Sequence, residues 1–108
     1  MKKGFGGGMQ QLMKQANQMQ NRMKKVQEEL KQREFEGSAG GGGVTVKVNG
    51  DTQLTAVMIQ QEVINDGDAE MLQDLILAAT NDAIKLAKET SQKEMEKITG
   101  GFSMPGMF

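Results

Sequence analysis

Histidine, cysteine, tryptophan and tyrosine are absent from this 108-residue chain. Without histidine, no side chain exchanges protons readily near neutral pH. Without cysteine there is no thiolate, disulfide or zinc–cysteine site, so metal binding would have to rest on carboxylates alone. The sequence therefore argues against an enzyme, and we expect no catalytic residues, no metal, no cofactor and no small-molecule substrate.

Long apolar segments are absent as well. No apolar run approaches the roughly 18 residues that a membrane helix requires. The segment Gly4-Phe5-Gly6-Gly7-Gly8, which follows the two lysines at the start, does not resemble the apolar region of a signal peptide. We therefore expect a cytoplasmic protein that has no membrane partner.

Core-forming residues are scarce. Leucine, isoleucine, valine and phenylalanine together supply 22 of the 108 residues, although the net charge of −1 argues against disorder. A chain of this length buries only about two thirds of its unfolded surface. We expect one domain, over residues 9–99, whose thin core is completed by a second chain.

Charge is balanced in sum but not along the chain. Residues 1–35 hold eight basic and three acidic side chains, whereas residues 36–80 hold one basic and seven acidic ones. Residues 81–108 hold four of each. A basic first third joined to an acidic middle suggests that one part of the molecule binds a polyanion.

The first predicted element is a long helix from Met9 to about Arg33, because this segment contains no glycine or proline and is rich in good helix formers. Residues 1–8 are predicted to be a flexible, glycine-rich tail. At roughly 37 Å, the helix should project beyond so small a core. Its apolar residues repeat with heptad spacing and form one seam, which consists of Leu12, Ala16, Met19, Met23, Val26 and Leu30.

A small sheet is predicted next. Valines alternate with polar residues over Val44–Val48, and Asn49-Gly50 is a typical turn in which both residues tolerate positive φ. Gln53–Ile59 then forms the returning strand. Glu34–Ala39 is either a third strand or the exit of the first helix at Gly37. Since two strands alone are marginal, a third strand or a partner's edge must complete the sheet.

A second helix is predicted from Ala69 to about Ile98, with Asp66 or Asp68 capping its N-terminus. Gly100-Gly101 ends it, and residues 100–108 form a flexible tail. Its apolar stripe consists of Leu72, Leu75, Ile76, Ala79, Ala83, Leu86 and Ala87. The order of helix, small antiparallel sheet and helix indicates an α+β fold.

Two segments resemble ligand-binding loops only weakly. Gly40–Gly43 precedes a strand, whereas a phosphate-binding loop opens a helix, so a bend at a sheet edge is the better interpretation. A calcium loop starting at Asp66 would need a glutamate at its twelfth position, where Leu77 stands. We interpret the carboxylates of this region as helix caps and a solvated face. They are Glu62, Asp66, Asp68, Glu70 and Asp74.

Basic residues on the first helix are the main functional signal. At about 100° per residue they point away from the seam, where they could lie along phosphates. The alternative is a solvated face with intrahelical pairs such as Lys24–Glu28, Lys25–Glu29, Lys85–Glu89 and Glu89–Lys93. No aromatic stacking platform accompanies the charge, which argues against single-strand binding.

These patterns resemble the YbaB/EbfC family of bacterial nucleoid-associated DNA-binding proteins over about residues 9–102. The resemblance rests on Gly40–Gly43 leading into Val44-x-Val46, on Asn49-Gly50, and most specifically on Leu72-x-Asp74-Leu75-Ile76-x-Ala78-Ala79-x-Asn81-Asp82-Ala83. We interpret Asp74, Asn81 and Asp82 within this motif as caps or helix-to-sheet hydrogen-bonding groups.

The resemblance implies a homodimer joined through the central sheet, with helical arms that grip double-stranded DNA with little sequence preference. On this basis the protein would organise or bridge the nucleoid and modulate transcription. By charge and helix face, the DNA-binding candidates are Lys14, Arg22, Lys24, Lys25, Lys31, Arg33, Lys85, Lys88, Lys93 and Lys97. The candidates for the sheet core and dimer contact are Val44, Val46, Val48, Leu54, Met58 and Ile59.

An alternative function remains open on the sequence alone. Met9, Met13, Met19 and Met23 lie on the first helix, and methionine-rich faces suit adaptable protein binding. Met19 and Met23 belong to the seam, where ordinary packing is the better explanation. The alternative is therefore a protein-interaction adaptor that docks partners through its methionine-rich heptad helix.

Overall fold

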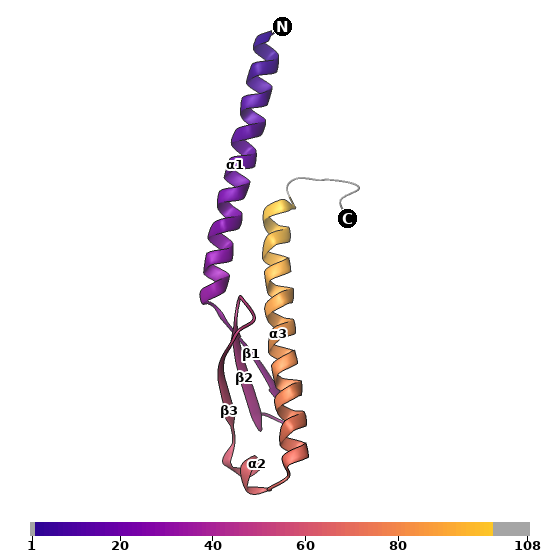
Figure 1. Ribbon diagram of the computed structural model, residues 1–108. Coiled ribbons are helices and arrows are strands. Elements are labelled where there is room, and N and C mark those ends of the chain that lie inside the picture. The colour runs from indigo at the N-terminus through magenta and orange to yellow at the C-terminus, as the bar shows by residue number, and fades with distance from the viewer. Residues whose placement is uncertain (1, 101–108) are drawn as a thin grey trace.

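The computed structural model, which describes residues 2–100, is an elongated rod with extents of 78 × 26 × 15 Å. Two long helices and a three-stranded sheet build it (Figure 1). The elements, in order, are α1 (Lys2–Gln32), β1 (Glu34–Ala39), β2 (Val44–Asn49), β3 (Leu54–Ile59), α2 (Gln61–Asn65) and α3 (Ala69–Thr99). The predicted α+β fold is confirmed. Neither long helix is apolar enough over the described residues to cross a bilayer.

Helix α1 begins at Lys2 rather than at Met9, so residues 2–8 continue the helix in place of the expected tail. Glycine lowers helix propensity, but it does not interrupt the backbone hydrogen-bond ladder that the following residues have already nucleated. The tail expected after α3 falls on residues 101–108, which lie outside the described residues.

The sheet is antiparallel in the order β1-β2-β3. Glu34–Ala39 is its third strand and not a helix exit, because Phe35, Gly37 and Ala39 pair with Val48, Val46 and Val44 and share one face with them. This face carries the apolar side chains. The opposite face of β1 and β2 is polar, as the alternation in sequence predicts.

The two hairpin turns differ in which residues have positive φ and in the hydrogen bonds that hold them. Gly40, Gly41 and Gly42 all have positive φ and form the β1–β2 turn, which supports the interpretation of the glycine run as a bend. In the β2–β3 turn the expected Asn49-Gly50 geometry is wrong, because the residue with positive φ is Thr52, at 61°. Asn49 instead accepts hydrogen bonds through Oδ1 from the backbone amides of Asp51 (2.9 Å) and Gln53 (3.1 Å).

Gly50 is required in this turn for a steric reason. A β-carbon at this position would overlap the backbone carbonyl of Leu30 in α1. The glycine therefore lets the β2–β3 turn lie against the end of the first helix. The sequence pattern correctly identified Gly50 as part of the turn, but the glycine is needed for close packing and not for positive φ.

Helix α3 covers the apolar face of β1 and β2 and extends past the sheet to lie beside the lower half of α1 (Figure 1). Small residues permit the close approach, because Ala79, Ala83 and Ala87 are buried against the sheet. Asp68 caps the helix as predicted, accepting a hydrogen bond from the backbone amide of Met71 at 3.0 Å. The buried core consists of Leu30, Phe35, Val44, Val46, Val48, Ala79, Ala83 and Ala87.

The three valines of β2 belong to this core. Val44, Val46 and Val48 have no exposed surface, since α3 of the same chain covers them. Their predicted role in the core is confirmed, but they have no surface left with which to contact a partner. Alternation along β2 correctly identified an apolar face, but it could not distinguish a helix from a second chain as the element that covers it.

Helix α3 packs on β1 and β2 but barely contacts strand β3. Leu54, Val57 and Met58 are about half exposed, at 50%, 46% and 47%, and Ile59 is half-buried. The strand has one neighbour, so its other edge is free in the single chain. Val57 was not among the predicted contact residues, although it shares a face with Val46 through the strand register.

The predicted roles of Asp74, Asn81 and Asp82 are wrong. All three side chains are exposed on α3, and none makes a hydrogen bond to another side chain or to the sheet within the part of the chain described. The alanines of the same motif, Ala79 and Ala83, are the members that face the sheet. Helical periodicity turns the exposed set away from the narrow strip of α3 that faces the sheet.

Candidate nucleic-acid interface

An arm of two antiparallel helices extends from the sheet. It consists of α1 and the C-terminal half of α3, and we call it the helical arm (Figure 1). Its lower part is held by the apolar seam of α1, because Leu30 is buried in the core and Val26 packs against it together with Met95 of α3. The seam predicted from heptad spacing is therefore the contact between the two helices over this stretch.

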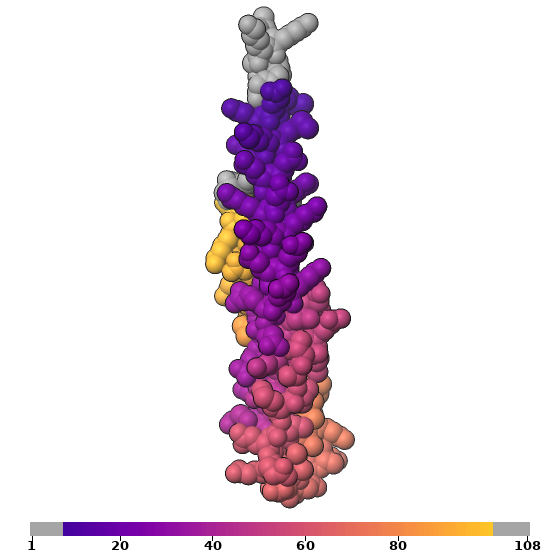
Figure 2. Space-filling model, turned by 90° about the vertical axis from the view of Figure 1, so that its left-hand side faces the viewer, coloured from indigo at the N-terminus to yellow at the C-terminus, as the bar shows by residue number. Residues whose placement is uncertain are grey.

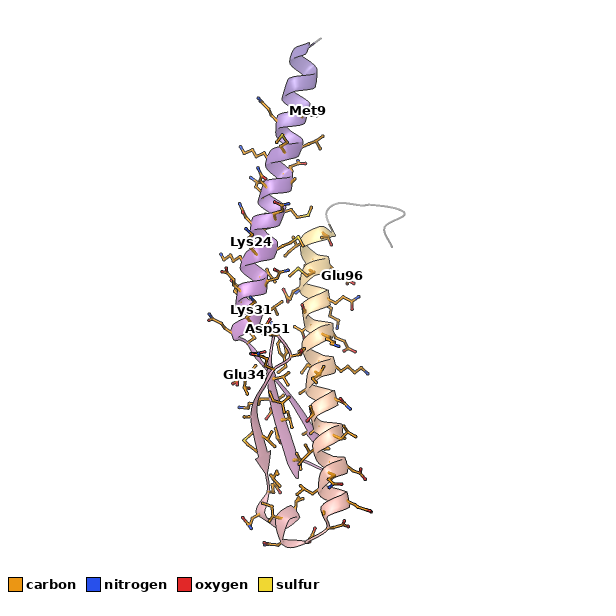
Figure 3. All side chains as sticks on the ribbon, viewed as in Figure 1. Met9, Lys24, Lys31, Glu34, Asp51 and Glu96 are labelled. Carbon is orange, nitrogen blue, oxygen red and sulfur yellow. The ribbon has the colours of Figure 1, made fainter. Side chains whose placement is uncertain are left out.

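The basic residues of α1 lie outside this contact. All five described basic side chains of the helix are exposed, and two glutamates are the acidic residues of the same segment. Figure 3 shows Lys24 and Lys31 on the part of α1 that runs beside α3, whereas Met9 lies on the part beyond it. The exposed basic residues are Lys14, Arg22, Lys24, Lys25 and Lys31.

Ion pairs do not neutralise this cationic helix. Within the described residues both ion pairs lie on α3, between Lys85 and Glu89 (4.0 Å) and between Lys97 and Glu94 (3.4 Å). The first of these confirms a predicted pair. The pairs expected on α1, and the pair between Glu89 and Lys93, do not form among these residues. The basic face of α1 therefore keeps its charge available for an external anion.

Arg33 stands at the junction between α1 and β1. Its side chain is exposed, and its guanidinium carbon lies 5.2 Å from the centre of the Phe35 ring. Such a cation–π contact holds the charged group at the base of the helical arm. Arg33 thus extends the basic surface of α1 toward the sheet.

Helix α3 contributes a weaker basic surface. Lys85, Lys88, Lys93 and Lys97 are all exposed as expected, but two of them pair with glutamates. Acidic side chains alternate with the lysines along the helix, so its C-terminal half has no continuous positive face. The structure therefore separates the ten candidates into a cationic set on α1 and at its junction with β1, and a mixed set on α3.

The acidic middle of the chain lies largely at the sheet end of the rod. Glu36 of this segment is exposed on β1. Glu34, which belongs to the first third of the chain, is exposed on the same strand and accepts a hydrogen bond from the Thr55 hydroxyl of β3 at 2.7 Å. The turn before α3 adds Asp66 and Asp68, both exposed. No group of three acidic residues lies close enough to hold a metal ion within the described part of the chain.

This chain is similar to known proteins of one family. The model of the YbaB/EbfC DNA-binding family matches residues 5–102. A nucleoid-associated protein of Clostridium novyi is 56% identical over 107 residues, covering 97% of this chain and 94% of its own. One of Caldanaerobacter subterraneus is 49% identical, covering 99% and 98%.

A solved structure has the same fold. The crystal structure of an uncharacterized protein from Helicobacter pylori superimposes with a TM-score of 0.71 at 25% identity, covering 84% of this chain and 96% of the other. The family match spans both helices and the sheet between them. The chain therefore belongs to the YbaB/EbfC DNA-binding family.

Proposed function

We propose that this protein is a nucleoid-associated protein that binds double-stranded DNA mainly through phosphate contacts made by α1. The family is described by DNA binding and not by a reaction, and the relatives in Clostridium and Caldanaerobacter are named nucleoid-associated proteins. We accordingly place the protein in the cytoplasm, at the nucleoid, with DNA as its partner and without an enzymatic activity.

One observation carries this proposal. The basic side chains of α1 are exposed along a helix whose apolar seam is turned toward α3, and none of them is paired with an acid among the described residues. Lysine and arginine side chains on such a face bind phosphates without reading bases, which suits loose sequence preference. Lys85, Lys88, Lys93 and Lys97 would add secondary contacts.

We also propose that the protein acts as a homodimer joined through β3. This strand has a free edge and half-exposed apolar side chains on both faces, with Leu54 and Val57 on one and Met58 on the other. Exposed apolar edge strands favour pairing with another chain. A second copy added along β3 would continue the sheet and bury these residues together with Ile59.

Such a dimer would carry two helical arms. Phosphate contacts that are weak on one arm add when both arms bind the same DNA, and two arms on separate duplexes would bridge them. This arrangement accounts for organisation of the nucleoid, and for modulation of transcription where the bound duplex contains a promoter.

A titration of labelled duplex tests the proposal. Fluorescence anisotropy of a duplex of about 30 base pairs would be measured against protein at about 50 and about 200 mM salt. If six to ten phosphates are contacted, the affinity should fall by roughly 10³ to 10⁵ between the two conditions. Absence of binding at the lower salt concentration would contradict the proposal and favour the adaptor function.

A further inference from the structure

The apolar seam of α1 loses its cover where α3 ends. Near the sheet, Leu30 is only 5% exposed, whereas Leu12 on the same seam is 63% exposed. Met9 and Met13, beside it, are exposed to a similar extent. Figure 2 shows this part of α1 extending alone past the end of α3. The outer two turns of the seam therefore present an unpartnered apolar surface.

The end of α3 lies directly below this surface. Ile98 borders a hollow of about 130 Å³ between the two helices, which is also lined by Gln15, Gln18, Met19 and Arg22 of α1. The helix ends at Thr99, with Gly100 as its C-cap. The chain that follows Gly100 thus begins next to the point where the seam becomes exposed.

The sequence of residues 101–108 is suited to covering an apolar surface. It reads Gly-Phe-Ser-Met-Pro-Gly-Met-Phe, so four of the eight side chains are large and apolar and none is charged. Pro105 prevents this segment from simply continuing α3 as a helix. An uncharged segment also adds no acidic group that would compete with phosphates for the basic side chains of α1.

Residues 101–108 are long enough, and attached closely enough, to reach the exposed seam of α1. Eight extended residues span roughly 26 Å at about 3.3 Å per residue, whereas α1 rises only about 10 Å between Ala16 and Met9. A segment attached at the end of α3 has an effective concentration on the order of millimolar at the seam. A second copy of α1 is a poorer occupant, because a separate chain lacks the effective concentration that the covalent link gives to residues 101–108.

We propose that residues 101–108 lie along the outer seam of α1 in the same chain and cover Met9, Leu12, Met13 and Ala16. The segment then packs against the outer part of α1 as α3 packs against its lower part. The helical arm would therefore be stiff along its whole length. This contact does not depend on DNA binding or on the mode of dimerisation.

A spin label on the segment tests the proposal in the full-length protein. The chain contains no cysteine, so Ser103→Cys gives a single attachment site. The labelled chain, isotopically enriched, would be diluted into an excess of unlabelled chain so that only effects within one chain are observed. We expect selective broadening of the backbone amide signals of residues 9–16, with the signals of Ala79 and Ala83 unchanged as a control for the fold.

Two substitutions in α1 locate the contact. Leu12→Ser should abolish the broadening, whereas Gln11→Ser, at an exposed polar position one residue away, should preserve it. Amide hydrogen exchange of residues 9–16 should accelerate several-fold in Leu12→Ser but not in Gln11→Ser. Absence of broadening would overturn the proposal. In the converse mixture, an isotopically enriched chain without the spin label is added to an excess of labelled, unenriched chain. Broadening that appears only in this mixture would also overturn the proposal, because the segment would then occupy a second copy.

Discussion

Gly37 of β1 lies directly beneath Ala83 of α3, so close that a β-carbon on Gly37 would overlap the backbone nitrogen of Ala83. The carbonyl oxygen of Ala79, one turn earlier, is equally close. Because both alanines are small and the glycine has no side chain, helix and strand backbones approach each other directly. This contact fixes the distance between α3 and the sheet, and therefore the direction in which α3 leaves the sheet to meet α1.

Substitution of Gly37 by alanine should destabilise the protein strongly. The added methyl group must displace the backbone of α3, and overpacking of this kind costs roughly 1–3 kcal/mol or more. At about 4–8 °C per kcal/mol for a domain of this size, thermal unfolding should show a clear decrease in Tm. Gly8→Ala is the matched control, since nothing lies near a β-carbon at that position in α1 and its Tm should stay the same or rise. Equal Tm values for the two variants would contradict the close contact.

Removal of the cap of α3 should have a smaller and specific effect. Asp68→Ala deletes the acceptor for the Met71 amide, and loss of such an N-cap costs about 1 kcal/mol. Asp66→Ala removes the same charge two residues earlier, at the C-cap of α2, where the backbone amide and not the carboxylate makes the capping hydrogen bonds. Chemical denaturation of both variants should show a lower unfolding midpoint for Asp68→Ala alone. A similar decrease in both would mean that charge, and not the hydrogen bond, stabilises this end of the helix.

Two further substitutions distinguish effects on the proposed dimer from effects on the stability of the core. Val46→Ala, in the fully buried core, should lower the free energy of unfolding by about 1–3 kcal/mol while the protein remains dimeric. Val57→Lys, at a half-exposed position of β3, should instead convert the dimer to a monomer, because it places a charge in an apolar interface.

Sedimentation measurements of both variants would check this prediction. Gln73→Lys, at an exposed position of α3, introduces the same charge away from β3 and should leave the dimer intact. If Val57→Lys remained dimeric, the interface would have to lie on another surface.

Charge reversal on α1 should weaken DNA binding without disturbing the dimer. Replacement of Lys24 and Lys25 by glutamate removes two phosphate contacts, so the dependence of log affinity on log salt should become less steep by about 2. Anisotropy titrations over a range of salt concentrations would measure this slope.

A matched single substitution distinguishes a local from a global effect of charge. Lys24→Glu and Lys47→Glu change the net charge equally, but Lys47 lies in β2, on the face of the sheet opposite to α3. We expect a clear loss of affinity for the first and little change for the second. Equal losses would point to the total charge of the protein and not to α1.

Local patterns in the sequence determined most of the elements. Heptad spacing located the seam of α1, valine alternation located β2, and an aspartate before an apolar stripe located the start of α3. Each of these signals is contained within a few helical turns or one strand, because side-chain direction repeats every 3.6 residues in a helix and every two in a strand. The basic face of α1 follows from the same geometry, since residues that avoid the seam must point outward.

The tertiary structure alone decided which element covers each apolar face. Val46 and Val57 both have apolar side chains on the same face of the sheet, yet α3 buries the first and leaves the second half exposed. The roles of Gly37 and Gly50 likewise arise from backbones that are distant in sequence and meet only in the folded chain. Periodicity specifies that a face is apolar, but the partner of that face depends on long-range packing, which no local pattern contains.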